Sequence, residues 1–513
     1  MSRGENILTL WKDKRENIIF ALIFLAGFFL YFKSLSAFFI LDDYPSIVDN
    51  PVIKHFNVSA IWRHDPSRFL TNLSFAVNYA LHGLQTPGWH GVNVLLHCAA
   101  AAAVFQTTNI ILQTPKIKSL RNDGRRFAVS AAAALLFLVH PLQTQAVINV
   151  VQRSTLLASL FYFLSLKNYL QGRITDDRKY YVLSVMFAAF GMFSKPLTMT
   201  LPLMIIVSDI ILFGAEKRSQ LKSAITVVAV GILSVLVPAG FIGIERLGLF
   251  AGDGVRAISW GQRLLTESNI IFTYLRLLIF PVNQNIDYDY PMAQQFFEIP
   301  TIFSVLGLAA LSAVTIGMCR RSPLLSLGTA WFLITLSPVV IFPFADLIFE
   351  HWAYLPSYGF FLCAVIIGET LFKNADLRKT ILAVWVAVLV TLTWSRAALW
   401  QDPVALMQDT VKKSPQKARV HNNLGLILWE QGRTEEAKSS FQTAIQLDPG
   451  YVLANNNLAS LFLKENKFSE ARELLEKAIA KAPHYLDLYV NLGYAYEGMN
   501  NFPEAAGYFN FVI

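Results

Sequence analysis

The chain has 513 residues, of which 54% are hydrophobic and only 15% are charged, a balance that excludes a soluble globular protein of this size. Its net charge of +8 comes from basic residues scattered between apolar runs, so no nucleic-acid partner is indicated. The three cysteines (Cys98, Cys319 and Cys363) fall in or beside apolar segments and indicate neither a disulfide framework nor a zinc site. The composition predicts a polytopic membrane protein.

Apolar runs of spanning length recur along the first 400 residues. The first run follows a charged leader without a cleavage site behind it and is interpreted as a retained anchor. The segment 269–281 is short and carries Arg276 in its middle, so it is interpreted as a re-entrant or interfacial helix. Eleven spans are predicted, near residues 18–36, 90–113, 127–140, 154–171, 180–194, 197–213, 223–243, 301–319, 323–342, 357–372 and 380–398.

The distribution of Lys and Arg predicts the orientation of these spans. Basic residues concentrate at the N-terminus and in "PKIKSLRNDGRR", "GAEKRSQLK", "CRRS" and "KNADLRK", which alternate with segments poor in basic residues. Because short loops rich in Lys and Arg stay inside, the N-terminus is predicted to be inside. The loop after the first span, and the region after the last span, are then outside.

Two adjacent carboxylates, Asp42 and Asp43, follow directly on the first apolar run, in "FFILDDYPSIVDNP". An Asp near the centre of a bilayer costs roughly 2.5–3.5 kcal/mol on insertion scales. Either the helix has ended and both acids are solvated in a turn, or the acids have a function at the outer membrane surface. An Asp pair could also hold a divalent cation, although it is a weak ligand set, and no other cofactor is indicated.

Further polar residues fall on the predicted outer side. Arg and Lys side chains suit a phosphate at the membrane surface, and a carboxylate suits a base toward a hydroxyl acceptor. These residue types therefore suggest a site for an anionic, lipid-linked donor. Two alternatives stay open: Tyr288 as an ordinary residue of the interfacial aromatic belt, and His140 as a helix cap. The candidates for binding the donor phosphate or substrate are Arg68, His140, Arg153, Lys195, Arg256, Arg263, Asp287, Tyr288, Glu350, His351 and Tyr354.

Residues 401–513 repeat with a period of 34, as Pro415, Pro449 and Pro483 show. Small residues recur at one register (Gly425, Ala459, Gly493), and large apolar residues recur at another (Phe441, Leu475, Phe509). This pattern is typical of about three tetratricopeptide repeats, the last one incomplete. Such an α-solenoid offers a groove for a protein partner. Two domains are predicted: a membrane domain over 1–400 and a repeat domain over 401–513.

Five segments occur in order ahead of the repeats: "FFILDDYPSIVDNPVI", "RFLTNLSFAVNYALHG" with "GWHGVNVLLH", "LVHPLQTQAVINVVQRSTLLA", "FSKPLTMTLPLMIIVSD" and "EHWAYLPSYGF". With the repeats, this set resembles the transmembrane-and-tetratricopeptide-repeat O-mannosyltransferases and their bacterial relatives. These are GT-C glycosyltransferases, which use polyprenyl-phosphate sugars. The resemblance implies an all-α GT-C membrane bundle followed by the solenoid, and a catalytic acid at Asp42 or Asp43. It also implies a polyprenyl-phosphate-linked sugar as donor and a protein hydroxyl as acceptor.

The function expected from these observations is that of an integral membrane glycosyltransferase for protein O-glycosylation. Asp42 is expected to act as the base, with inversion at the sugar, while Asp43 orients the loop, the acceptor or a metal. The repeats are expected to bind the acceptor protein. The short repeat array, without a retrieval signal of the endoplasmic reticulum, favours the inner membrane of a bacterium with a periplasmic site. The alternatives are transfer to a lipid or a cell-envelope glycan, and a non-catalytic scaffold or flippase that uses the repeats for assembly.

Overall fold

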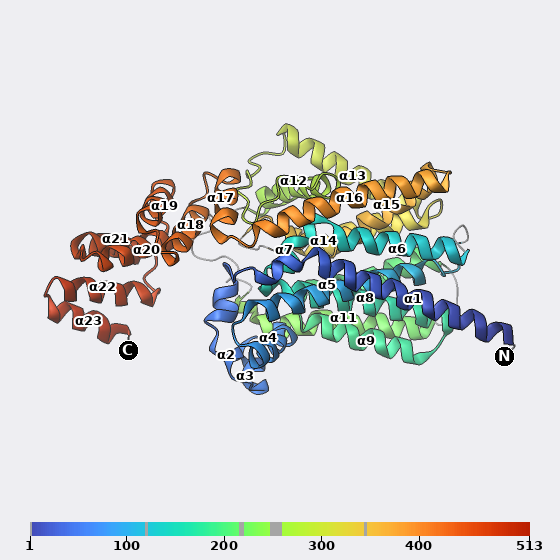
Figure 1. Cartoon of the computed structure of the whole chain (residues 1–513), viewed down its shortest axis with the longest axis horizontal. Helices are drawn as coiled ribbons and strands as arrows, with labels where there is room; N and C mark the ends of the chain where they lie inside the picture. The colour runs from blue at the N-terminus through green and yellow to red at the C-terminus, as the bar shows by residue number, and fades with distance from the viewer. Residues whose placement is uncertain (1–2, 118–121, 215–219, 247–258, 343–345, 513) are drawn as a thin grey trace. The chain divides into compact units, whose positions relative to one another are not determined.

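The fold is described from a computed structural model, which covers residues 3–117, 122–214, 220–246, 259–342 and 346–512. Within these ranges every regular element is a helix, as the apolar patterns predict. The chain divides into two compact units (Figure 1). The membrane unit comprises Met1–Gln284 and Pro291–Gln401, and the repeat unit comprises Asn285–Tyr290 and Asp402–Ile513.

Among its described residues, the membrane unit holds sixteen α-helices and several short turns of 3₁₀ or π helix. The α-helices are α1 Arg3–Leu30, α2 Pro51–Lys54, α3 Val58–His64, α4 Phe69–His82, α5 Thr86–Ile111, α6 Asp123–Val139, α7 Thr144–Ile148, α8 Arg153–Thr175, α9 Arg178–Met192, α10 Leu201–Leu212, α11 Gln220–Arg246, α12 Trp260–Ile279, α13 Ile299–Met318, α14 Pro323–Ile341, α15 Ser357–Leu371 and α16 Ala375–Leu399. The short turns are η1 Phe32–Ser36, η2 Tyr44–Val48, η3 Pro66–Arg68, η4 Pro141–Gln143, η5 Val150–Gln152, η6 Pro196–Thr200 and η7 Glu350–Ala353.

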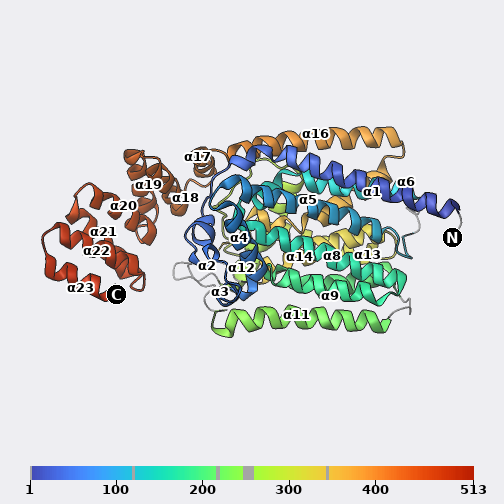
Figure 2. The same cartoon turned by 60° about the horizontal axis from the view of Figure 1, so that its bottom comes forward.

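Helix α5 lies at the centre of this unit, where it packs against α1, α6 and α8 (Figures 1 and 2). Its alanine run (Ala100, Ala101 and Ala103) is buried, and small side chains let neighbouring helix backbones approach closely. The Thr107 hydroxyl donates a hydrogen bond of 3.2 Å to the carbonyl of Phe163 in α8. The short helices α2, α3 and α4 lie at the end of the bundle opposite the start of α1.

Five described helices are long and apolar enough to cross a membrane: α5, α11 over Gln220–Val237, α13, α14 and α16. A sixth is reached if α6 and the following Pro141–Ile148, which meet at 54°, count as one bent span. The eleven predicted spans are therefore not reached by this measure within the described residues. Length accounts for three of the missing spans, because α9 has 15 residues, α10 has 12 and α15 has 15, all short of a full crossing. Helices α1 and α8, with 28 and 23 residues, are long enough but do not meet the measure of hydropathy and charge.

Helix α12 covers the segment that was predicted to be re-entrant or interfacial, and it does not meet the criterion for a span. It is 20 residues long and begins earlier than predicted, because Ser259 and Gln262 form a capping box there. Arg276 is exposed near its end, where its guanidinium donates to the carbonyl of Val282 at 3.4 Å.

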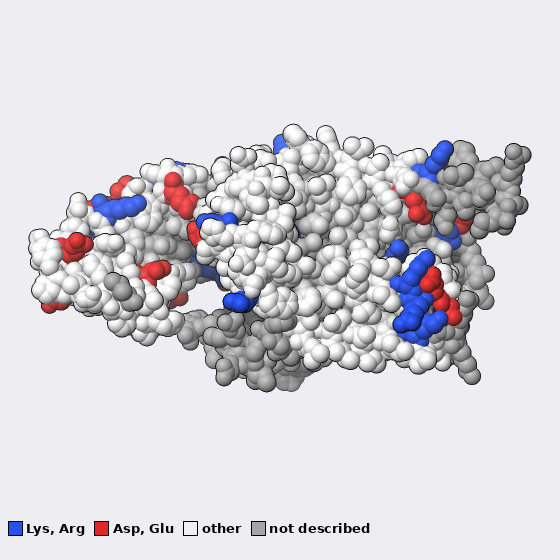
Figure 3. Space-filling model, turned by 90° about the horizontal axis from the view of Figure 1, so that it is seen from below, with Lys and Arg blue, Asp and Glu red and all other residues white. Residues whose placement is uncertain are grey.

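Charged side chains are unevenly spread over the surface of the membrane unit. Figure 3 shows a broad surface without Lys, Arg, Asp or Glu, and a group of charged side chains at one end. At the turn from α8 to α9 and the start of α11, Lys222 pairs with Asp176 at 2.7 Å and Lys179 with Asp177 at 3.3 Å. An apolar surface bounded by charges is typical of a helix bundle in a bilayer.

The repeat unit consists of α17 Pro403–Lys413, α18 Ala418–Glu430, α19 Thr434–Leu447, α20 Val452–Lys464, α21 Phe468–Lys481, α22 Leu486–Gly498 and α23 Phe502–Val512. The helices from α18 onward pack as three consecutive pairs, which correspond to the three predicted repeats. Small residues on the first helix of a pair face large ones on the second: an added Cβ at Gly425 would lie 2.7 Å from Phe441, and one at Gly493 would lie 2.5 Å from Phe509. In the second repeat the corresponding pair is Ala459 and Leu475, and both lie in one buried cluster.

Replacing Gly425 with Ala is expected to destabilise the repeat unit by about 1–3 kcal/mol, the typical cost of overpacking. The new methyl group would meet the Phe441 ring and, at 3.1 Å, the carbonyl of Ala437. The matched control is Gly507→Ala, because nothing lies within 4 Å of a Cβ there. Thermal unfolding of the two variants measures the difference, and equal midpoints would contradict this account of the helix crossing.

The repeat unit also contains a segment from outside the predicted repeat domain. Asn285–Tyr290 lies between α12 and α13 in sequence, yet it packs with Asp402–Ile513. The 34-residue period contains no signal for this segment, because the segment is not itself a repeat.

Candidate active site

The segment from Pro141 to Gln152, which comprises η4, α7 and η5, is the structural centre of the candidate site. It follows α6 and is almost completely buried, although it is rich in amides: Gln143, Gln145, Asn149 and Gln152 are each at most 8% exposed. The side-chain carbonyl oxygens of Gln143 and Asn149 accept no hydrogen bond within the described part of the chain. Buried amides usually have partners, so such oxygens are expected where water or a ligand completes the site.

Asp43 binds to this segment and is fully buried. One carboxylate oxygen accepts a hydrogen bond of 2.7 Å from the backbone N–H of Val151, and the other accepts one of 3.2 Å from the N–H of Ile40. Burial raises the pKa of Asp43 to about 7, against the opposing effect of these backbone N–H groups. Asp43 therefore anchors the loop between η1 and α2 to η5.

Asp42, by contrast, is exposed. Leu41, just before it, has a positive φ of 48°, and this backbone turn separates the two carboxylates, one toward the interior and one toward the surface. Of the predicted catalytic pair, only Asp42 is thus placed where a substrate hydroxyl could approach its carboxylate.

Arg153, at the start of α8, is also fully buried. Its guanidinium donates to the side-chain oxygens of Asn93 and Asn78, each at 2.8 Å, and to the carbonyl of Trp89 at 3.1 Å. It also lies over the rings of Phe75 and Trp89, at 4.9 and 5.4 Å from their centres. With its donors directed at the protein, Arg153 ties α4 and α5 together and faces the negative charge of Asp43. It is a structural residue rather than a phosphate ligand.

Lys195, in the turn between α9 and η6, contacts the same segment from another side. Its ammonium group donates to the Thr155 hydroxyl at 2.8 Å and to the Gln152 side-chain oxygen at 3.4 Å. Burial, and then the positive charge of Arg68, lower the pKa of Lys195 to about 7. Arg68 comes close because the start of α4 is attached to this turn, where Leu70 N–H donates to the carbonyl of Phe193 at 2.9 Å.

His351, in η7, completes the group. Its backbone N–H donates to the side-chain oxygen of Gln145 at 2.8 Å, and its ring Nδ1 lies 3.1 Å from the same oxygen. Burial, followed by the charges of Lys195 and Arg68, holds the pKa of His351 well below its usual value, so the ring is neutral. Two cations, a neutral imidazole and several amides are therefore gathered around one buried segment, next to the Asp42–Asp43 turn.

Four other predicted residues have structural partners in the membrane unit. His140 caps η4, because its Nδ1 accepts from Leu142 N–H at 3.2 Å and its Nε2 donates to the Leu278 carbonyl at 3.1 Å. The alternative of a helix cap is therefore the one that the structure shows. Glu350 is buried and accepts from the Gln284 amide at 3.0 Å.

Tyr354 and Arg263 likewise have partners inside the unit. The Tyr354 hydroxyl donates to His97 Nδ1 at 2.8 Å, deep among buried aromatic rings. Arg263 pairs with Glu267, one helical turn further along α12, at 3.4 Å, and both side chains are buried. Burial raises the pKa of Glu267 to about 8, and Arg263 opposes that rise.

The remaining predicted residues do not belong to this group. Asp287 and Tyr288 are part of the repeat unit, where Asp287 pairs with Lys417 and Arg419. Arg256 lies outside the described residues. Among the residues that the structure describes, no three His, Cys, Asp or Glu side chains gather as a metal site would require.

Sequence reasoning missed Gln145, Gln152 and Thr155, which hold His351 and Lys195 in place. A signal was present: three glutamines and an asparagine interrupt an otherwise apolar run in "HPLQTQAVINVVQR". Glutamines in an apolar run are costly unless they find partners.

The comparisons with known proteins bear on both units. Models of the tetratricopeptide repeat match residues 400–452, 428–477 and 462–510. The chain is similar to protein O-mannosyl-transferase F38B6.6 of Caenorhabditis elegans (28% identical over 444 residues, 82% of this chain and 61% of that protein). It is also similar to human TMTC4 (27%, covering 79% and 63%) and Drosophila melanogaster Tmtc3 (24%, covering 85% and 55%), both named protein O-mannosyl-transferases.

The chain thus spans 55–63% of the length of these three relatives. Among solved structures, the crystal structure of MamA matches 25% of this chain at 25% identity, with a TM-score of 0.21.

Proposed function

We propose, from its relation to the protein O-mannosyl-transferases, that this membrane protein transfers a sugar to a hydroxyl group of a protein acceptor. The observation that carries the proposal is the group formed by Lys195, Arg68 and His351 around the buried segment 141–152, to which Asp43 anchors the turn that carries Asp42. A scaffold would gain nothing from holding a half-buried lysine near an arginine, because like charges near each other are destabilising. An anionic ligand removes that cost.

The proposed donor is a polyprenyl-phosphate-linked sugar. Its phosphate would lie against Lys195 and Arg68, since an ammonium and a guanidinium are the groups that bind phosphate best. Neutral His351 and the amides of Gln145 and Gln152 are suited to hydrogen-bond sugar hydroxyls. Arg263, which the sequence analysis offered as a phosphate ligand, is left out because Glu267 already pairs with it.

In the proposed reaction, Asp42 takes the proton of the acceptor hydroxyl as the acceptor oxygen bonds to the anomeric carbon. The bond from that carbon to the phosphate oxygen breaks, and the polyprenyl phosphate leaves with the electron pair. Attack on the side opposite the leaving group inverts the sugar. A phosphate needs no general acid to leave, so one base and two cations are sufficient for the step.

The decisive experiment is intact-mass glycoproteomics of the host envelope with the wild-type gene, with the gene deleted, and with Asp42→Asn. Protein glycoforms that vanish in both deletion and variant support the proposal. Changes confined to a lipid or glycan would favour the alternative acceptor. Unchanged glycoforms in the variant would favour a scaffold or flippase.

The repeats are proposed to lie on the outer side of the membrane, which is the periplasmic side if the host is a bacterium. Ser439 is exposed in α19 and suits a labelling test, because its replacement disturbs no buried contact. In a variant whose native cysteines are replaced, Ser439→Cys is expected to react with an impermeant thiol reagent in intact cells or spheroplasts. Labelling that appears only after lysis would overturn this orientation and the outer position of the site.

A further inference from the structure

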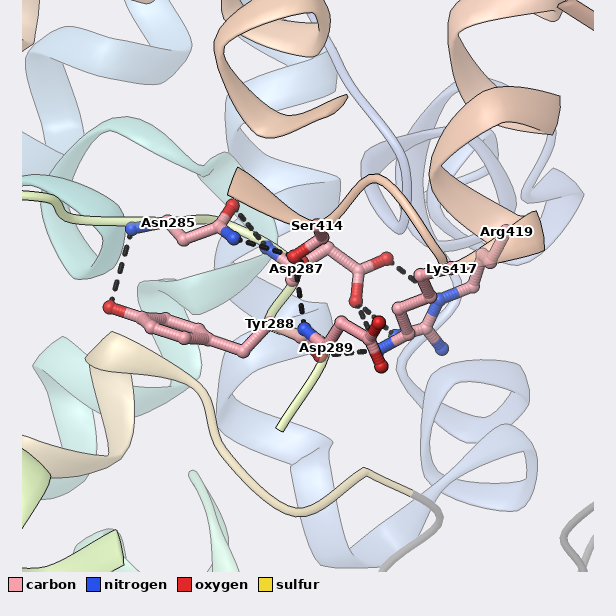
Figure 4. Close-up of polar contacts among 7 residues, drawn as sticks. All are labelled: Asn285, Asp287, Tyr288, Asp289, Ser414, Lys417 and Arg419. Atoms are coloured by element: carbon pink, nitrogen blue, oxygen red, sulfur yellow. Dashed lines mark hydrogen bonds and ion pairs between the residues drawn. The ribbon is translucent and has the colours of Figure 1, made fainter. Parts of the chain in front are cut away.

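The segment Asn285–Tyr290 is held by the turn between α17 and α18 through a dense set of polar contacts (Figure 4). The hydroxyl of Ser414 is at their centre. It donates to the carbonyl of Asp287 at 2.8 Å and accepts from the side-chain amide of Asn285 at 2.8 Å and from the N–H of Asp289 at 2.9 Å. Ser414 is fully buried, so these contacts exclude water.

The side chain of Asp287 carries the charge in this set. Its carboxylate accepts two hydrogen bonds from Arg419, at 2.8 Å to Nε and 2.6 Å to Nη2, and lies 2.6 Å from the ammonium group of Lys417. Lys417 also donates to the carbonyl of Tyr288 at 2.8 Å. Paired donors of one guanidinium on one carboxylate form the strong, directional kind of ion pair. Asp287 itself is 4% exposed.

The surroundings keep this carboxylate ionised. Burial works against the charge, but the bonds and charges of Arg419 and Lys417 outweigh it and lower the pKa of Asp287 below its usual value. Because the pKa is lowered on folding, the pairing contributes fully above the ordinary Asp pKa of about 3.9 and is lost only as the pH falls below it. Around neutral pH the pair is therefore permanent.

Because of these contacts, the backbone passes between the two units more than once. Residues before Asn285 and residues 291–401 belong to the membrane unit, so the chain enters the repeat unit twice. While the segment is bound to the repeat unit, the backbone passes between the two units at three peptide bonds: 284/285, 290/291 and 401/402. If the segment were released from the repeat unit, only the bond 401/402 would connect the two units. Additional links reduce the volume that a tethered module can explore and raise the effective concentration of whatever it carries.

We propose that Asn285–Tyr290 is a clasp that holds the repeat unit to the loop between α12 and α13, and that transfer to a protein acceptor depends on this clasp. The second part rests on the proposed function, while the first does not. Asp287 and Arg419 are positioning residues in this proposal, since neither touches the reacting atoms. The clasp explains why a carboxylate first considered for the catalytic site is buried against repeat residues instead.

Asp287→Asn tests the clasp, and Asp289→Asn is the matched control, because it removes an exposed charge two residues away. The first readout needs no activity: chymotrypsin cleavage of the full chain after Tyr288, which the clasp should protect. Cleavage is expected to be at least about tenfold faster in Asp287→Asn than in wild type or control, because the variant removes the buried charge that both Arg419 and Lys417 bind and so weakens the clasp. Equal cleavage in all three proteins would overturn the clasp.

The second readout is transfer to a protein acceptor compared with transfer to a short peptide. Asp287→Asn is expected to raise the acceptor KM at least about tenfold for the protein, with the kcat unchanged, and to leave the peptide reaction unchanged. Arg419→Gln should have a smaller effect in the same direction, because Lys417 still pairs with Asp287, and the double variant should add little to Asp287→Asn. Arg419→Lys, which keeps the charge, should recover part of the loss and shows that the repeats still fold.

The outcomes separate the two proposals. Faster cleavage with unchanged protein transfer would overturn the dependence on the clasp and leave the clasp itself. An absence of any transfer by the wild-type protein would overturn the proposed function, while the cleavage result would still decide the clasp. Truncation before Asp402 is a poorer test, because it also leaves Asp287 without Arg419 and Lys417.

Discussion

Asp42→Asn is expected to lower turnover at least about a hundredfold while the protein keeps its fold and its affinity for the donor. Asp42 is exposed at the turn after η1, and asparagine has nearly the same size and shape, so the fold should tolerate the substitution. An amide cannot accept the proton of the acceptor hydroxyl, and general base catalysis typically contributes about 10²–10⁴-fold. The measurement is single-turnover transfer by the purified protein, alongside donor binding.

The control is Asp43→Asn, which changes the neighbouring carboxylate in the same way. An Asn oxygen can still accept the shorter hydrogen bond, from Val151 N–H, and only the longer one from Ile40 N–H is lost, so the loop should stay anchored and activity should fall much less. Because burial raises the pKa of Asp43 to about 7, folding favours its protonated form. Wild-type stability should therefore fall as the pH rises from about 4 to 7, and Asp43→Asn should abolish that part of the fall. Transfer by Asp42→Asn within a few-fold of wild type would remove Asp42 from the chemistry.

Lys195→Met is expected to lower kcat/KM for the donor by about 10–100-fold, the loss typical of removing a charged hydrogen-bond donor worth 1.5–3 kcal/mol. Methionine fills most of the volume of the lysine stem, so the turn before η6 should keep its packing. The matched control is Lys222→Met. Its lysine pairs with Asp176 at the start of α11 and should have no part in donor binding. Equal losses in the two variants would contradict the proposed phosphate site.

A pH profile separates charge from packing at the same position. With a pKa near 7, Lys195 is ammonium below that pH, so donor kcat/KM should fall as the pH rises through about 7. His351 does not blur this step, because its ring stays neutral across it. Lys195→Arg should retain much of the activity and lose this fall, since a guanidinium remains protonated. The comparison is best made with Asp43→Asn as the parent, because Asp43 also titrates near pH 7.

The sequence by itself determined the features that depend on local spacing and composition. The 34-residue period predicted the repeats, down to the small residues Gly425 and Gly493 that the large rings of Phe441 and Phe509 require. Apolar runs predicted a membrane bundle, although eleven spans stay a prediction beside the five or six helices that meet the criterion for a span. The ordered motifs predicted the relation to the O-mannosyl-transferases. Each of these signals arises because neighbouring residues share one helix, one face or one register.

Which polar side chains share a site was decided only by the tertiary structure. Adjacent Asp42 and Asp43 read alike in sequence, but the backbone turn at Leu41 leaves one exposed and buries the other against Val151. Lys195, Gln152 and His351 come together from distant segments, while Asp287 pairs with Arg419, 132 residues away. The energy of a buried charge depends on the partners that the fold supplies, and linear spacing carries no information about those partners. For that reason the residue types of the site were predictable and their pairing was not.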